Sequence, residues 1–66
     1  MEFVEKAKIM LEHWITHNEH HQEEYEMFAE QLEGAGMGES ARYVREMTGL
    51  TCRSTQCLKK ALTALK

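Results

Sequence analysis

The chain contains 66 residues, which is enough for one domain with a small core. Hydrophobic residues make up 42% of it and charged residues 29%, a balance that is typical of soluble globular proteins and excludes full disorder. The formal net charge is −3, so general binding to nucleic acids is not expected. Two cysteines are too few for a disulfide scaffold, and no apolar run approaches the ~20 residues of a membrane span. A small cytoplasmic protein is expected.

The composition predicts an all-α protein. Proline is absent and all eleven acidic residues are glutamate, which tolerates helix interiors. Three of the four glycines lie close together in the middle of the chain and divide it into two helical halves. The expected domain is a single helical hairpin over residues 1–66, with a first helix at about 2–33, a loop at 34–39 and a second helix at about 40–66. Gly34 is expected to be the left-handed residue that ends the first helix, and Ser40 or Gly38 to cap the second.

Each half carries a stripe with alternating spacings of three and four residues, which is the pattern of a helix that packs along one face. In the first half the stripe consists of Val4, Ala7, Leu11, Trp14, Asn18, His21, Tyr25, Phe28 and Leu32. In the second half it consists of Met37, Ala41, Val44, Thr48, Thr51, Thr55, Leu58, Leu62 and Leu65. Gly49 and its β-branched neighbours weaken the second stripe, so we expect one long helix with a soft centre or a bend there.

A short loop between two long helices makes an antiparallel hairpin, in which the polar middle of the first stripe meets the threonine-rich middle of the second. This pairing brings His21 level with Thr51 and Cys52. The charge distribution agrees with it, because the first 33 residues contain nine glutamates and two lysines, and the last 33 contain six basic residues and two glutamates. The expected interhelical ion pairs join Glu26 and Glu30 to Arg42 and Arg45.

Two helices alone cannot surround a core. Each stripe is wide enough to need more than one neighbour, and large side chains such as Trp14 and Phe28 would otherwise face water. The economical solution is a homodimer in which two hairpins form an antiparallel four-helix bundle. Docking onto another protein would satisfy the same pattern.

All four histidines lie within nine residues and fall on one arc of the first helix. His17 and His21 are four residues apart, a spacing at which side chains stack on one face and offer two ligands to one ion. Imidazole, carboxylate and thiolate groups together suit zinc, nickel, copper or iron. The expected metal site is centred on His17 and His21, and its further candidate ligands are Glu24, His13, His20, Cys52 and Cys57.

The same residues have a metal-free interpretation. Asn18 and His21 would form a buried polar layer that fixes the register and the oligomeric state, with the hydroxyl groups of Thr51 and Thr55 as partners. The cysteines would then be small fillers or free thiols.

Two functions are therefore predicted. The first is a small homodimeric binding module with a histidine-rich transition-metal site, and the alternative is a metal-free dimerisation or adaptor module that binds protein. No catalytic acid–base pair, activated nucleophile or phosphate-binding loop is evident in the sequence, so an enzyme is not expected.

Overall fold

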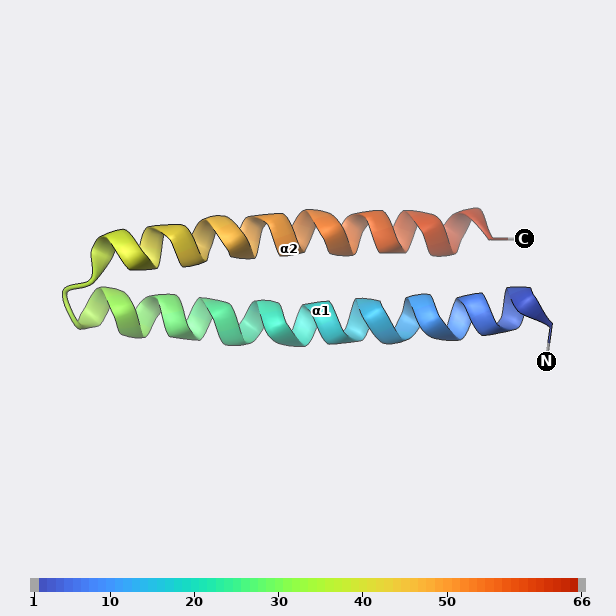
Figure 1. The fold of residues 1–66 in the computed structure, drawn as a ribbon, viewed down its shortest axis with the longest axis horizontal. Coiled ribbons are helices and arrows are strands. Elements are labelled where there is room, and N and C mark those ends of the chain that lie inside the picture. Colours follow the sequence, from blue (N-terminus) through green and yellow to red (C-terminus); the bar gives the residue numbers. More distant parts are fainter. Residues whose placement is uncertain (1, 66) are drawn as a thin grey trace.

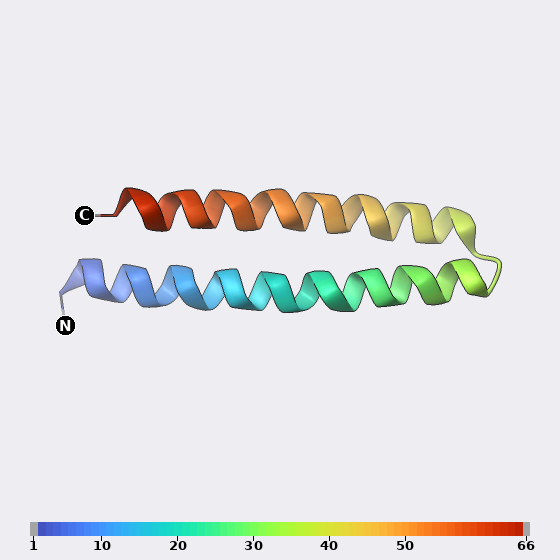
Figure 2. The same ribbon diagram turned by 180° about the vertical axis from the view of Figure 1, so that it is seen from behind.

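The computed structural model describes residues 2–65, which form two antiparallel α-helices joined by a short loop (Figure 1). Helix α1 spans Phe3–Gly34 and helix α2 spans Gly38–Ala64. Seen from behind, the two helices again lie side by side along their length (Figure 2). The predicted all-α hairpin is therefore confirmed, with α2 beginning slightly earlier than expected. Lys66, the expected last residue of this helix, lies outside the described residues.

The loop closes through a Schellman motif on Gly36. Gly36 has a φ of 81°, its N–H donates to Glu33 O at 3.1 Å, and Met37 N–H donates to Leu32 O at 2.8 Å. Gly34 remains helical, so the prediction that Gly34 is the left-handed residue was wrong.

The reason for this choice of glycine lies in the apolar residues beside it. A Schellman motif places a hydrophobic pair at the residue after the left-handed glycine and at the residue four before that glycine. Closure on Gly36 gives these positions to Met37 and Leu32, which are both apolar. Closure on Gly34 would give one of them to Glu30.

Helix α2 begins directly after the loop, at Gly38, and Met37 occupies the capping position without a side-chain hydrogen bond. Gly38 is the first helical residue and Ser40 lies inside the first turn, so the prediction of Ser40 or Gly38 as the cap was wrong, because the loop is shorter than expected. Helix α2 also continues without interruption through Gly49. None of the helices within residues 2–65 is both long and apolar enough to cross a membrane.

The α2 stripe packs against α1 largely as predicted. Ala41, Thr48 and Thr55 are buried, and Met37 is exposed. The five other residues of the predicted stripe are half-buried. The buried hydroxyl groups find hydrogen-bond acceptors within α2. Thr48 Oγ1 donates to Val44 O at 2.9 Å, and Thr55 Oγ1 donates to Thr51 O at 3.0 Å. The threonines therefore present methyl groups to α1 without leaving a polar atom unpaired.

The α1 stripe differs from the prediction at two of its nine positions. Ile15 and Ala29 are the α1 residues that become buried, whereas Trp14 and Phe28, which were expected in this seam, are 46% and 52% exposed. Two overlapping stripes on α1 share residues such as Leu11 and Tyr25. Helix α2 covers the stripe that contains the small side chain of Ala29. Ala29 and Ala41 are both 0% exposed, so the two backbones approach closely there.

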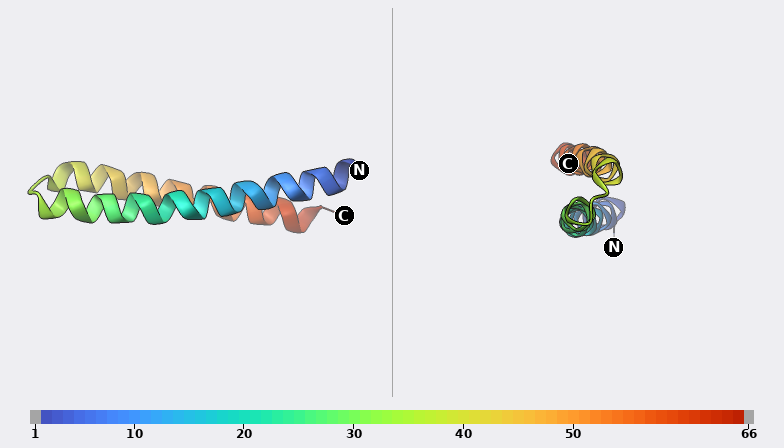
Figure 3. Two further views of the ribbon diagram at one scale, coloured as in Figure 1. Left: turned by 90° about the horizontal axis from the view of Figure 1, so that it is seen from below. Right: turned by 90° about the vertical axis from the view of Figure 1, so that its left-hand side faces the viewer.

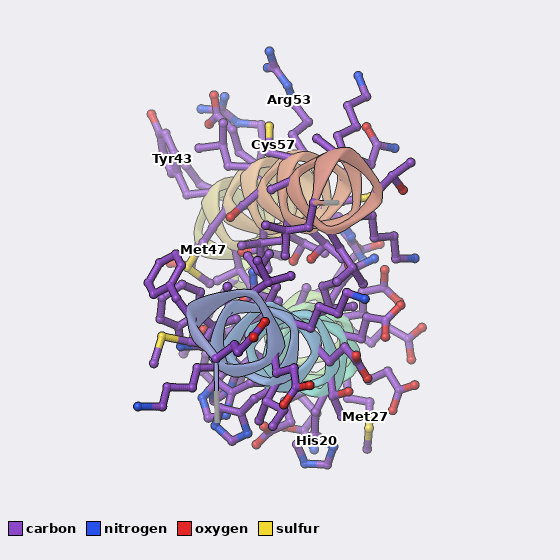
Figure 4. All side chains as sticks on the ribbon, turned by 90° about the vertical axis from the view of Figure 1, so that its right-hand side faces the viewer. His20, Met27, Tyr43, Met47, Arg53 and Cys57 are labelled. Atoms are coloured by element: carbon purple, nitrogen blue, oxygen red, sulfur yellow. The ribbon has the colours of Figure 1, made fainter. Side chains whose placement is uncertain are left out.

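The rotation of α1 gives the hairpin two unlike sides. The first, which we call the apolar flank, consists of Phe3, Met10, Trp14 and Phe28 of α1 with Met47 of α2. The second, which we call the charged flank, consists of Glu19, Glu26, Glu30 and Glu33 of α1 with Arg45 and Lys59 of α2. At 100° per residue, the two sets lie on opposite sides of the buried stripe, and Met47 lies at one side of the hairpin in Figure 4.

Ion pairs join the helices along the charged flank. Arg45 Nη1 bonds to Glu33 Oε2, and Lys59 Nζ lies 3.3 Å from Glu19 Oε2. Arg42 instead pairs with Glu39 of its own helix at 3.9 Å. The prediction that Glu26 and Glu30 pair with these two arginines was therefore wrong. Both of these glutamates line the same surface hollow as Arg45, but Glu33, nearer the loop, is the residue that reaches its guanidinium.

The hairpin is a single layer with a thin core. It measures 51 × 16 × 10 Å, and end-on views show α1 and α2 crossing at a shallow angle (Figure 3). The radius of gyration is 15.3 Å, against about 11 Å for a compact domain of this length. Among the described residues no large side chain is fully buried. A chain of this shape keeps most of its apolar side chains in contact with solvent.

Candidate functional site

Three histidines and a tyrosine form a continuous stack of rings along α1. The ring centroids of His13 and His17 are 5.9 Å apart, and those of His17 and His21 are 4.3 Å apart. Tyr25 continues the stack, with its ring nearly parallel to that of His21 at 5.8 Å. The four-residue spacing places these side chains one above the other on one helix face. We call this row of rings the histidine ladder; His13, its first member, lines a hollow with Met10 and Trp14 of the apolar flank.

The centre of the ladder is a direct contact between two ring nitrogens. His17 Nε2 lies 2.7 Å from His21 Nε2, and His21 Nδ1 lies 3.2 Å from Glu24 Oε1. A carboxylate only accepts hydrogen bonds, so the contact with Glu24 favours the tautomer of neutral His21 that carries its proton on Nδ1. In this tautomer His21 Nε2 carries a lone pair and accepts the N–H of His17.

This arrangement sets two imidazole nitrogens facing each other. Two imidazole nitrogens that bind one zinc ion at about 2.0–2.1 Å lie about 3.3 Å apart. The observed separation of 2.7 Å is therefore about 0.6 Å too short for both to bind one ion unless the side chains rotate. Within residues 2–65, no group of three or more His, Cys, Asp or Glu side chains is arranged to hold a metal ion.

The other candidate ligands lie farther from this pair. His20 Nε2 is 3.8 Å from Glu24 Oε1, and His20 points away from α2 in Figure 4. Cys52 lines a hollow on the charged flank, with Glu26 among its neighbours. Cys57 is exposed and points away from α1 (Figure 4). The structure therefore brings His13, His17, His21 and Glu24 together and leaves the cysteines apart from them.

The separation of Cys52 from the histidines follows from the rotation of α1. The sequence placed His21 in the seam that faces α2, level with Cys52. In the structure Gln22 borders the hollow that Cys52 lines on the charged flank, and the His21 ring instead contacts His17 and Tyr25 along α1.

The polar layer at the middle of the hairpin also has other partners than expected. Asn18 Nδ2 lies 3.5 Å from Ser54 Oγ, and the Thr55 hydroxyl donates to Thr51 O. His21 bonds along α1 rather than across to α2. The stacking of Tyr25 on His21 was not predicted; the signal for it was present, since Tyr25 continues the four-residue spacing of the histidines.

Comparison with known proteins gives one family. The family described as a domain of unknown function, DUF8180, matches residues 7–65, which include the whole ladder and nearly all of both helices. No curated protein and no solved structure matches the chain.

Proposed function

The chain belongs to the DUF8180 family, and we propose that it is a homodimerising helical-bundle module that binds a transition metal ion through His17 and His21. The observation that carries this proposal is the approach of two ring nitrogens to 2.7 Å on a side of the hairpin that α2 does not cover. Imidazole is a ligand for zinc, nickel, copper and iron. The proposal has two parts, the dimer and the metal, which rest on different features.

The dimer is supported by the surface that the hairpin leaves open. Its accessible surface is 5214 Å², whereas a folded monomer of 7.7 kDa exposes about 4300 Å². The excess of about 900 Å² is close to the ~800 Å² that each partner contributes to a stable interface. Packing two apolar flanks together would remove this excess and complete a four-helix bundle.

A second copy of the chain suits this surface better than an unrelated protein does. The apolar flank presents aromatic and methionine side chains, the residue types that are enriched in interface centres. The charged flank lies on the opposite side, so two copies joined through their apolar flanks keep their glutamates in water. Each chain carries a net charge of −3, and this arrangement keeps the two sets of glutamates far apart.

The metal is supported by the contact between His21 Nδ1 and the Glu24 carboxylate. In metal sites, a ligating histidine usually donates its second ring N–H to a carboxylate, which fixes the tautomer and raises the basicity of the ligating nitrogen. His21 resembles this arrangement, because its Nδ1 lies 3.2 Å from Glu24 Oε1 and its Nε2 faces the ring of His17. Glu24 is therefore assigned to orient His21 rather than to bind the ion.

Native mass spectrometry of untagged protein, purified without chelator, tests both parts. The expected spectrum shows a dimer that takes up metal in whole numbers when zinc, nickel, copper or iron is added. The double variant His17→Ala/His21→Ala is expected to remain helical and to lose this uptake. Thr16→Ala is the control, because Thr16 is exposed on the same helix and takes no part in the contacts described for this site, and it is expected to keep the uptake. A dimer that stays free of metal refutes the metal site, and a monomer refutes the bundle.

The second candidate function is a metal-free dimerisation or adaptor module. It is favoured by the hydrogen bond between His17 and His21, which satisfies both rings without an ion. In this case the double alanine variant changes the dimer dissociation constant or the melting temperature, and added metal changes neither in the wild-type protein.

A further inference from the structure

The histidine pair lies at the middle of the hairpin. The midpoint of α1, which runs from Phe3 to Gly34, falls between Asn18 and Glu19. His17 and His21 lie on either side of this point. Since α1 sets the 51 Å length of the molecule, the same level is the middle of the whole hairpin.

Two-fold symmetry brings this level of one chain to the same level of a second. If the axis is perpendicular to the helices, the apolar flanks overlap fully only when the axis crosses the hairpin at its midpoint. If the axis is parallel to the helices, every residue lies level with its own copy. In both arrangements the His17–His21 pair of one chain lies level with the same pair of the other.

The shape of the apolar flank favours the perpendicular axis. Positions equally far from the midpoint then lie level with each other, so Phe28 of one chain meets the segment Ile9–Met10 of the other. Phe28 is exposed, and Met10 and Trp14 line two hollows of the surface at that level. A projecting ring on one half and a hollow on the other half form a self-complementary surface, as an isologous interface requires.

We infer that the second copy completes the metal site. One ion lies on the two-fold axis, bound by Nε2 of His17 and Nε2 of His21 from each chain. This inference rests on the proposed dimer and specifies its ligand set and stoichiometry. It explains why one hairpin offers two facing nitrogens, although no three side chains within its described residues are arranged to hold a metal ion.

The charge and the donor atoms of this site fit a divalent ion that prefers tetrahedral coordination. Four neutral imidazoles suit zinc, which is bound almost always by four ligands in structural sites. The two Glu24 carboxylates, one on each His21, supply two negative charges near the ion and balance its charge of +2. The ion stabilises the dimer, because a single chain cannot provide the complete shell.

A zinc titration followed by native mass spectrometry and sedimentation equilibrium tests the shared site. The expected result is one zinc ion per two chains. Because the site exists only in the dimer, zinc at a hundred times its dissociation constant is expected to lower the dimer dissociation constant about a hundredfold. Replacement of zinc by cobalt is expected to give the intense visible absorption of a tetrahedral ion.

The variants separate the shared site from the dimer itself. His17→Ala/His21→Ala is expected to dimerise with a dissociation constant that zinc does not change, whereas Thr16→Ala, at an exposed residue outside the site, is expected to respond as the wild type does. Two zinc ions per dimer would overturn the shared site and leave the proposed function standing. A dimer without zinc would overturn both metal proposals, and a monomer that binds zinc would overturn the dimer and the shared site together.

Discussion

The same substitution, glycine to alanine, is expected to have opposite effects at two positions of this hairpin. Gly36 has a φ of 81°, in the left-handed region, whereas Gly49 lies within the continuous helix α2. A Cβ atom added at either position meets no other atom within 4 Å. The effect of each substitution is therefore one of backbone conformation alone.

The expected magnitudes follow from these conformations. An alanine in the left-handed region costs about 1–2 kcal/mol, so Gly36→Ala is expected to lower the free energy of unfolding by about 1 kcal/mol or more. An alanine in place of glycine inside a helix gains about 0.5–1 kcal/mol, so Gly49→Ala is expected to raise it by that amount. Each 1 kcal/mol shifts the melting temperature of a domain this small by about 4–8 °C.

Circular dichroism during thermal unfolding measures both shifts. All variants are compared at one protein concentration, because the melting temperature of a dimer depends on concentration. Gly49 borders the hollow on the charged flank, so its substitution leaves the apolar flank unchanged. Gly34→Ala is the control for the loop, since Gly34 is helical and also open to solvent. If Gly36→Ala melts at or above the wild-type temperature, the assignment of Gly36 as the left-handed residue of the loop is refuted.

Three other substitutions test the packing of the hairpin and its surface. Ala41→Leu adds bulk where the side chain is fully buried, and urea denaturation is expected to show a loss of about 1–3 kcal/mol; an unchanged midpoint would contradict the close approach of the helices. Glu33→Gln removes the exposed ion pair with Arg45, and it is expected to lower the free energy of unfolding by less than about 1 kcal/mol. High salt is expected to remove most of this difference by screening the ion pair in the wild type; a larger loss that does not depend on salt would contradict the view that this pair is exposed. Trp14→Gln is expected to keep the helix content and weaken dimerisation about tenfold or more in sedimentation velocity, and a dimer of unchanged affinity would exclude the apolar flank as the interface.

The α2 stripe was predictable because this helix has a single run of apolar and threonine residues at heptad spacing. The α1 stripe was predictable only in part. Leu11, Tyr25 and Leu32 belong to two overlapping stripes, one continued by Ile15 and the other by Trp14, and periodicity alone does not say which of them faces the second helix. Which stripe faces α2 depends on how closely the two helices approach each other, and this distance is set by the side chains of both helices together.

The candidate site shows the same limit. The four-residue spacing of His17 and His21 predicted that their rings meet, because this contact lies within one helix. The relation of Cys52 to His21 depends on the rotation of α1 against α2, and it could not be read from spacing. The contact between His21 and Glu24 is again local, and it follows from the spacing of three residues.

The three-residue loop also determines the order in which the two helices come together during folding. Arg45 and Glu33, beside the loop, are separated by 12 positions in the chain, whereas Asn18 and Ser54, at the middle, are separated by 36. The entropy lost in closing the longer segment costs about 1 kcal/mol more than that of the shorter one. We therefore expect interhelical contacts to form first at the loop and to extend from there along the two helices (Figure 1). Amide hydrogens in the helical turns far from the loop are then expected to exchange with solvent sooner than those beside it.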